Sequence, residues 1–132
     1  MLAKTVTYMD YNGVERKETF YFNLTEAELT EMQMSEYGGL TNMLQKIIDS
    51  QDSKAIMREF KKLILLAYGV KSDDGKRFIK NDQVREEFSQ TEAFSEIYME
   101  LLTDSDAAAA FVNGIVPAKF AKALEQKAAE IA

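Results

Sequence analysis

The pattern of hydrophobic and polar residues changes near residue 24, where alternation with a period of two gives way to helical spacing. Residues 1–23 hold two runs rich in Val, Thr, Tyr and Phe, and Asn12-Gly13 lies between them. An Asn-Gly pair favours the two-residue type I′ turn of a β-hairpin, because both central positions of that turn need positive φ. The pattern therefore predicts an N-terminal β-hairpin over residues 1–23. The alternation is imperfect around VERKE, which an edge position or a longer loop would explain.

Residues 24–116 follow the spacing of amphipathic helices and predict a mostly helical body of about five or six helices. Thr25 and Glu28 have the spacing of a capping box, so we expect the first helix to begin there. Gly38-Gly39 supplies the left-handed conformation that commonly ends a helix. A second, short helix is predicted over residues 41–49.

The stretch from Ser53 to Tyr68 has the clearest helical pattern. Its first half is amphipathic, but from Leu63 onward it is apolar on nearly all sides, which is typical of a helix that is buried or covered by a partner. We expect Gly69 to end this helix. The polar segment Ser72–Gly75 is typical of a turn, and the residues that flank it predict a very short second hairpin.

Further helices are expected in the last part of the chain. Their predicted N-cap residues are Asn81 or Asp82 for the first, Ser89 in a capping box with Glu92 for the second, and Thr103 or Asp104 for the third. The third of these helices is expected to end near Gly114, and Pro117 suits the first turn of a final one. The sequence thus predicts one α+β domain over 1–132, with a C-terminal helix over 117–132 as a candidate mobile element.

Composition narrows the classes of function. Of 132 residues, 46% are hydrophobic and 29% charged, as in an ordinary globular domain, and cysteine and histidine are both absent. Disulfides, Cys–His dyads and Ser-His-Asp triads are therefore excluded, and a zinc site would need carboxylates alone. The formal net charge of −6 opposes binding to nucleic acid or to an anionic membrane, and it suits a basic partner. The first residues lack the apolar core of a signal peptide, and the run LILLAYGV is too short to span a bilayer, so we expect a cytoplasmic protein.

Three patterns resemble chemical sites, and each has a simpler structural explanation. The stretch YGVKSDDGKRF lacks the spacing of a phosphate-binding loop, and Asp73 and Asp74 would repel a phosphate. These adjacent aspartates, and TDSD at 103–106, do not match the alternating ligands of a calcium loop. No pair among the 22 acidic residues stands out as a glycosidase pair. We expect no catalytic, cofactor or metal site, and we interpret these acidic residues as turns, helix starts and solvated faces.

The methionine content and the apolar helix over 53–68 are both compatible with an apolar surface that binds another protein. The chain has seven methionines, a residue that fills cores but is also over-used at adaptable binding surfaces. The predicted helices over 53–68 and 91–102 offer an apolar groove, and self-association is another way to cover an apolar surface. The candidate partner-binding residues, which the pattern assigns to the core or to a groove, are Ile56, Phe60, Leu63, Phe94 and Tyr98.

Several segments resemble one family. The stretches YMDYNGVERKETFYFNLTEAEL, AYGVKSDDGKRFIKND, EEFSQTEAFSEIYMELLTD and AAAAFVNGIVP together are similar to small tail assembly chaperones of long-tailed phages and prophages of Gram-positive bacteria. The resemblance covers most of the chain, from about Thr5 to Pro117, and includes no catalytic motif.

The resemblance implies a non-enzymatic assembly function in the cytoplasm of the bacterial host. Members of such a family bind the tape measure protein, which is long, helical and prone to aggregate, and keep it soluble. They assist the tail tube protein as it polymerises around the tape, and they leave before the virion is complete. In many phages a ribosomal frameshift also makes a longer form.

Two other functions stay open on the sequence. One is a structural virion protein, such as a tail completion or connector subunit, which would be found in finished particles. The other is a small regulatory protein that binds a host target through its acidic surface, with strong salt dependence.

Overall fold

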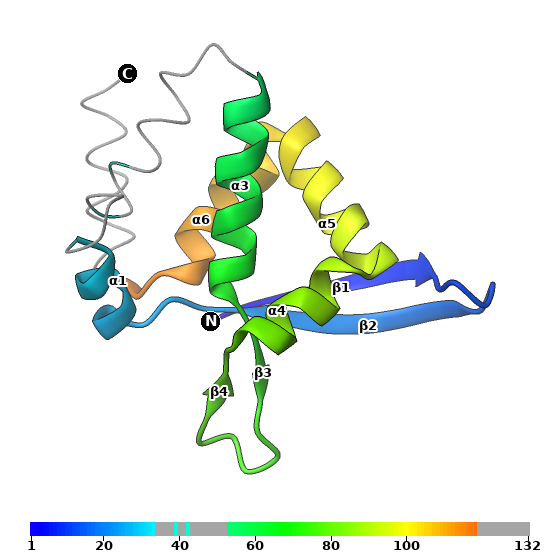
Figure 1. Ribbon diagram of the computed structural model, residues 1–132, viewed down its shortest axis with the longest axis horizontal. Helices are drawn as coiled ribbons and strands as arrows, with labels where there is room; N and C mark the ends of the chain where they lie inside the picture. Colours follow the sequence, from blue (N-terminus) through cyan, green and yellow to red (C-terminus); the bar gives the residue numbers. More distant parts are fainter. Residues whose placement is uncertain (34–38, 40–41, 43–52, 119–132) are drawn as a thin grey trace.

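The computed structural model describes residues 1–33, 39, 42 and 53–118. The elements in this part of the chain are β1 (Leu2–Met9), β2 (Glu15–Phe22), α1 (Glu26–Gln33), α3 (Ser53–Ala67), β3 (Tyr68–Lys71), β4 (Phe78–Ile79), α4 (Asp82–Ser89), α5 (Glu92–Thr103) and α6 (Ser105–Ile115). This order confirms the predicted α+β class, with an N-terminal hairpin followed by a helical body (Figure 1). The predicted helix over 41–49, the end of the first helix at Gly38, and nearly all of the helix over 117–132 lie outside the described residues.

The two hairpins join into one antiparallel sheet with the order β1-β2-β3-β4. In the first hairpin the register runs without interruption from Leu2 opposite Phe22 to Met9 opposite Glu15. The second hairpin, predicted from its turn, pairs with β2 only at the end of that strand, where Phe22 lies opposite Tyr68. The first hairpin therefore extends well beyond the second, and its loop projects past the helices (Figure 1).

The loop of the first hairpin differs from the predicted two-residue type I′ turn. Asp10 and Val14 form the last backbone pair, with the Asp10 N–H 2.9 Å from the Val14 oxygen, and Gly13 N–H donates to the Asp10 oxygen at 3.0 Å. Gly13 has φ of 77°, but no described residue other than glycine has positive φ, so Asn12 cannot occupy a type I′ position. Asp10 explains the change, because its carboxylate accepts the N–H groups of Asn12 and Val14 and stabilises a three-residue loop that ends in a left-handed glycine.

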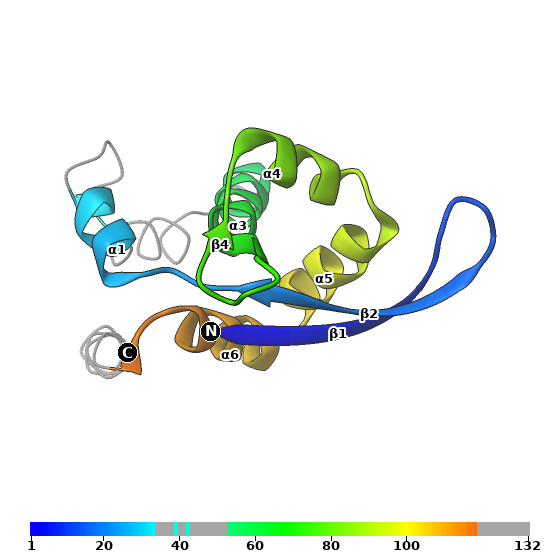
Figure 2. The same ribbon diagram turned by 90° about the horizontal axis from the view of Figure 1, so that it is seen from below.

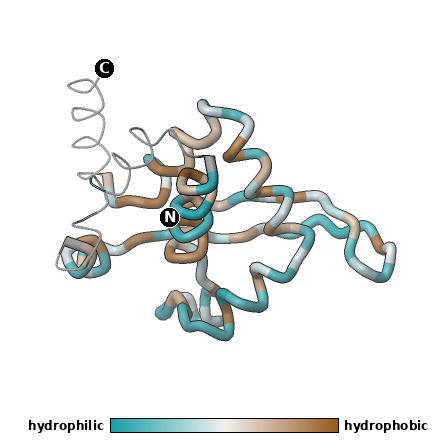
Figure 3. The backbone as a smooth tube through the Cα atoms, turned by 45° about the horizontal axis from the view of Figure 1, so that its top comes forward, coloured by the Kyte–Doolittle hydropathy of each residue, from teal (hydrophilic) through white to brown (hydrophobic). Residues whose placement is uncertain are grey.

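The helices α3, α5 and α6 cover one face of the first hairpin, and the β3–β4 hairpin points away from them (Figure 1). Seen from below, α5 crosses the first hairpin toward its β1 side, where α6 follows (Figure 2). Strand β1 alternates between half-buried and exposed residues because only one face of the hairpin is covered. Hydrophobic and hydrophilic residues likewise alternate within the helices (Figure 3).

The core lies between the end of the first hairpin and the helices. The largest fully buried side chains in the described part of the chain are Phe22, Leu24, Leu63, Ile64, Ile97, Phe111 and Ile115. Aromatic rings connect the two hairpins to α4, where Tyr68 stacks on Phe88 with ring centroids 3.9 Å apart. Phe22 contacts both of these rings and also Phe111 of α6. The apolar end of α3 is thus enclosed by this chain's own residues.

Most of the predicted helix starts are confirmed. Thr25 and Glu28 form the reciprocal capping box, with the two N–H···O distances at 2.9 and 3.1 Å. Asn81 caps α4 and Asp104 caps α6, so one member of each predicted pair is the N-cap. The exception is α5, which is capped by Thr91.

The predicted capping box of Ser89 and Glu92 is wrong. Ser89 is the last residue of α4, and its hydroxyl donates to the Glu86 carbonyl oxygen at 2.7 Å. Thr91 accepts the Phe94 N–H at 3.1 Å instead, and its own hydroxyl donates to the carbonyl of the preceding helix. The preceding helix therefore occupies the position that Ser89 would need as a cap.

Two glycines that were predicted to end helices are used for close packing. Helix α3 ends at Ala67, and Gly69 lies inside β3, where an added Cβ would be 2.7 Å from the Phe78 ring. Helix α6 continues through Gly114 to Ile115, and a Cβ on Gly114 would be 2.9 Å from the Leu2 side chain. Each glycine lets another element approach. The expected helix stop at Gly69 is corrected, because α3 has already ended and Gly69 belongs to β3. Helix α6 does end near Gly114, as expected.

Candidate functional site

The five predicted partner-binding residues lie on α3 and α5, two helices that contact each other. Leu63 and Phe94 are buried, with 0% and 7% of their surface exposed, and belong to the core. Ile56, Phe60 and Tyr98 are half-buried. The structure therefore brings the two predicted helices together, and the role of the five residues in binding stays a prediction.

Tyr98 connects the two helices directly. Its ring stacks on Phe94 with centroids 5.6 Å apart, and its hydroxyl donates to the Met57 carbonyl oxygen of α3 at 3.0 Å. Burial raises the pKa of the Tyr98 phenol above its ordinary value. The Met57 side chain beside it is 43% exposed, so the outer part of the α3–α5 surface retains accessible apolar area.

A cleft of about 370 Å³ lies between β1 and α5. Its lining residues are Thr5, Val6 and Thr7 from the strand and Glu96, Ile97, Met99, Glu100 and Thr103 from the helix. These helix residues follow helical spacing along the side of α5 that faces the strand. The buried Ile97 forms the floor, whereas Met99 is 51% exposed. The cleft thus combines a strand, an apolar floor and acidic groups on the helix.

The two glutamates in the cleft differ in their contacts. Glu100 pairs with Lys4 of β1, with 2.7 Å between the Lys4 Nζ and the carboxylate oxygen. Glu96 is exposed and has no hydrogen bond or ion pair with any described side chain. A carboxylate in this position attracts a cation, so the chemistry of the cleft favours a basic group on whatever enters it.

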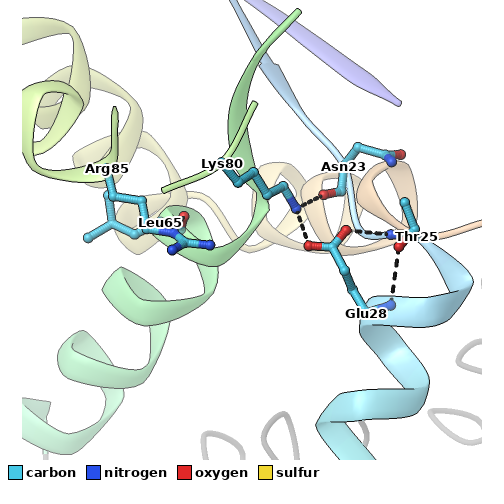
Figure 4. Close-up of polar contacts among 6 residues, drawn as sticks. All are labelled: Asn23, Thr25, Glu28, Leu65, Lys80 and Arg85. Carbon is cyan, nitrogen blue, oxygen red and sulfur yellow. Dashed lines mark hydrogen bonds and ion pairs between the residues drawn. The ribbon is translucent and has the colours of Figure 1, made fainter. Parts of the chain in front are cut away.

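A second polar cluster surrounds Lys80, just after β4 (Figure 4). The Lys80 ammonium donates to the Asn23 carbonyl oxygen at 2.6 Å and to Glu28 at 2.7 Å, and only 10% of the side chain is exposed. Burial would by itself raise the pKa of Glu28, but the hydrogen bonds from Lys80 and from the Thr25 N–H hold it below its ordinary value of 4.5. Burial also lowers the pKa of Lys80, against the opposing effect of Glu28. The cluster ties the second hairpin to the start of α1 and is structural.

The acidic turn between β3 and β4 also uses its polar groups locally. The Ser72 hydroxyl donates to Asp74 at 2.6 Å, the same carboxylate oxygen accepts the Lys76 N–H, and Gly75 has φ of 73°. These bonds, with the one from Ser72 first, lower the pKa of Asp74. They confirm the turn predicted from the sequence. Across the described residues, no group of three or more acidic side chains is placed to hold a metal ion.

Comparison with known proteins assigns the chain to a family. The family model described as "Phage tail assembly chaperone" matches residues 1–132. This chain belongs to the phage tail assembly chaperone family. No curated protein and no solved structure matches the chaperone. The sequence-based resemblance to tail assembly chaperones is therefore confirmed. In the described part of this chaperone, no helix is long and apolar enough to cross a membrane.

Sequence reasoning missed the cleft of this tail assembly chaperone. The two walls come from residues 5–7 and 96–103, which are about 90 positions apart, and no local pattern pairs them. One signal was present in the spacing of Glu96, Met99, Glu100 and Thr103, which puts polar and adaptable residues along one side of α5. That spacing alone is typical of any solvated helix face.

Proposed function

We propose that this tail assembly chaperone binds the tape measure protein of its phage, keeps that protein soluble and assists the assembly of the tail tube around it. The match of the family model along the whole of residues 1–132 carries the proposal. The chemistry of the surface supports it, because a net charge of −6 keeps a complex with an apolar client dispersed. The chaperone acts by binding and without catalysis, in the cytoplasm of the bacterial host.

The α3–α5 surface is the proposed contact for apolar helical segments of the client. Ile56, Phe60 and Tyr98 contact the client, and the buried Leu63 and Phe94 hold them in place from behind. A helix that binds in a groove contributes apolar residues at helical spacing, and the exposed Met57 adapts to their shape. The tail tube protein and a second copy of the chaperone are further proposed partners.

Co-expression with the tape measure protein tests the function. We expect the tape measure protein to move from the insoluble to the soluble fraction and to copurify with tagged chaperone. Ile56→Asp should lower the copurified amount about tenfold, because it places a charge in an apolar contact. Ala109→Asp, at an exposed position of α6, is the matched control and should have little effect.

Two outcomes would contradict the proposed function. One is that the tape measure protein stays insoluble and forms no complex with the wild-type chaperone. The other is that mass spectrometry finds the chain in purified particles, since a structural virion protein remains in the virion and a chaperone does not.

A further inference from the structure

The outer edge of β1 carries backbone groups that have no partner in the described part of the chain. β1 is the first strand of the sheet, and Asp10 and Val14 form a hydrogen-bonded pair. In an antiparallel ladder such pairs alternate with pairs whose backbone groups point away from the partner strand. Counting back from Asp10, every second residue of β1 therefore turns its N–H and C=O away from β2 and toward the outer edge. These residues are Ala3, Thr5, Thr7 and Met9. Thr5 and Thr19 fit this assignment, because their hydroxyls lie 2.9 Å apart, as expected for side chains in the closer type of pair.

β1 also lacks the features that usually protect an edge strand. It is eight residues long, contains no proline, and keeps an uninterrupted register with no bulge. Its single charged residue, Lys4, is engaged with Glu100 on the helix side. Proteins normally block such an edge with charges, prolines, bulges or a covering element. Among the described residues, α6 packs on Leu2 at the start of β1, and no element pairs with the edge beyond it. Such an edge is a template for the addition of another strand.

The cleft beside this edge limits what can be added. A strand alongside β1 would direct alternate side chains toward α5, where the cleft offers the half-exposed Met99 and the carboxylate of Glu96, which has no partner among the described side chains. From Ala3 to Met9 the edge spans about 20 Å, enough for about seven residues of an extended partner. The side chains that enter the cleft are therefore apolar, with a lysine or arginine placed opposite Glu96.

We propose that the β1 edge and the β1–α5 cleft form a second docking site, which takes an extended, basic segment of the client as a fifth strand of the sheet. This inference rests on the proposed function, because the occupant is part of the client chain. The site is separate from the α3–α5 surface, and it recognises the client's backbone through main-chain hydrogen bonds. Glu96 supplies the preference for a basic side chain.

A pair of proline substitutions tests the edge. Thr5 and Thr19 lie opposite each other, and the N–H of each points away from the β1–β2 ladder. Thr5→Pro removes an N–H from the proposed docking edge, whereas Thr19→Pro removes one from the opposite side of the hairpin, beyond Tyr21, where the pairing of β2 with β3 has ended. Both variants lose the same hydroxyl contact, so they should be equally stable by thermal unfolding. We expect Thr5→Pro to copurify about tenfold less tape measure protein than Thr19→Pro.

A charge reversal tests the cleft without altering a strand. Glu96→Lys should lower the copurified amount about tenfold, and Glu86→Lys, an exposed residue of α4 with the same change in charge, should not. Hydrogen exchange gives a direct signature in the wild-type complex. The N–H groups of Thr5 and Thr7 should exchange at least tenfold more slowly than in the free chaperone, whereas those of Val6 and Tyr8 are already bonded to β2.

The outcomes separate the two proposals. If the wild-type chaperone retains no tape measure protein, the proposed function fails. If it retains that protein and Thr5→Pro and Glu96→Lys match their controls, the docking site is wrong and the function stands. Protection of Thr5 and Thr7 in the free chaperone that grows with its concentration would mean that a second copy occupies the edge, which also overturns the proposal.

Discussion

Replacing Lys80 with methionine isolates the polar cluster that joins the second hairpin to α1. Methionine keeps the length of the side chain but removes the ammonium, so the Asn23 carbonyl oxygen and Glu28 each lose a donor, at 2.6 and 2.7 Å. The side chain is only 10% exposed, and little water is available to replace it. The Thr25 N–H still donates to Glu28, so the carboxylate keeps one hydrogen-bond donor.

The expected loss of stability follows from two opposing effects. Two hydrogen bonds to a charged group contribute about 3–6 kcal/mol together if both are simply lost. Methionine also removes the cost of burying a cation, which amounts to several kcal/mol, and the partly exposed Glu28 regains some water. We expect a net loss of about 2 kcal/mol in the free energy of unfolding for Lys80→Met. For a chain of this size, that lowers the unfolding midpoint by about 7 °C.

Thermal unfolding followed by circular dichroism measures this difference at pH 7 and at pH 3. Glu28 has a lowered pKa in the folded protein, so its contribution to the free energy of unfolding is fully present above pH 4.5 and is lost as the pH falls through the pKa of the folded state. Without Lys80 the pKa of Glu28 is lowered less, and the difference between wild type and variant should shrink at pH 3. Lys76→Met, in the exposed turn, is the control and should change the midpoint by little.

Two results would refute this reasoning. One is a difference at pH 7 of less than about 0.5 kcal/mol, which would place the cluster among surface ion pairs of little energetic value. The other is a difference that is equally large at pH 7 and pH 3, which would assign the loss to the packing of the Lys80 stem rather than to its charge.

Two further predictions concern the corrected helix ends. Thr91→Ala should lower the free energy of unfolding by about 1 kcal/mol through the loss of the N-cap, and Ser89→Ala by less than about 0.5 kcal/mol. Urea unfolding measures both, and equal losses would argue against Thr91 as the N-cap of α5. Gly69→Ala should cost about 1–3 kcal/mol because its Cβ would press on Phe78, whereas Gly75→Ala, which meets nothing within 4 Å, should cost about 1–2 kcal/mol through its positive φ alone. A longer side chain that is unbranched at Cβ separates the two causes, because it adds contact without adding strain at positive φ: the loss should grow from alanine to methionine only at position 69.

Local patterns predicted the elements of the fold well, since the information lies within a few neighbouring residues. The capping box of Thr25 and Glu28 and the turn at Ser72–Gly75 are of this kind. The errors occurred where a local signal competed with contacts from elsewhere. Glycine is typical of a helix stop, but Gly69 lies in a strand, where it leaves room for the Phe78 ring across the second hairpin.

The candidate site was less accessible to sequence reasoning. The candidate residues of α3 and α5 were identified by their periodicity, yet periodicity alone does not separate Leu63, which is buried, from Phe60, which is half-buried. The open edge of β1 depends on which strand is last in the sheet, and that order is set by the pairing of Phe22 with Tyr68. Such a pairing between distant segments leaves no repeat or spacing in the chain.

The bond from the Leu24 N–H to the Ile115 carbonyl oxygen, at 2.6 Å, has a consequence for synthesis on the ribosome. About 90 residues separate its two ends, so at 5–20 residues per second roughly 5–18 s pass between the emergence of the first hairpin and that of its partner in α6. Contacts of such long range form late in folding. During this interval the nascent hairpin has neither its covering helices nor a neighbour at β1, so the chaperone itself passes through a state in which the apolar face of the hairpin is exposed.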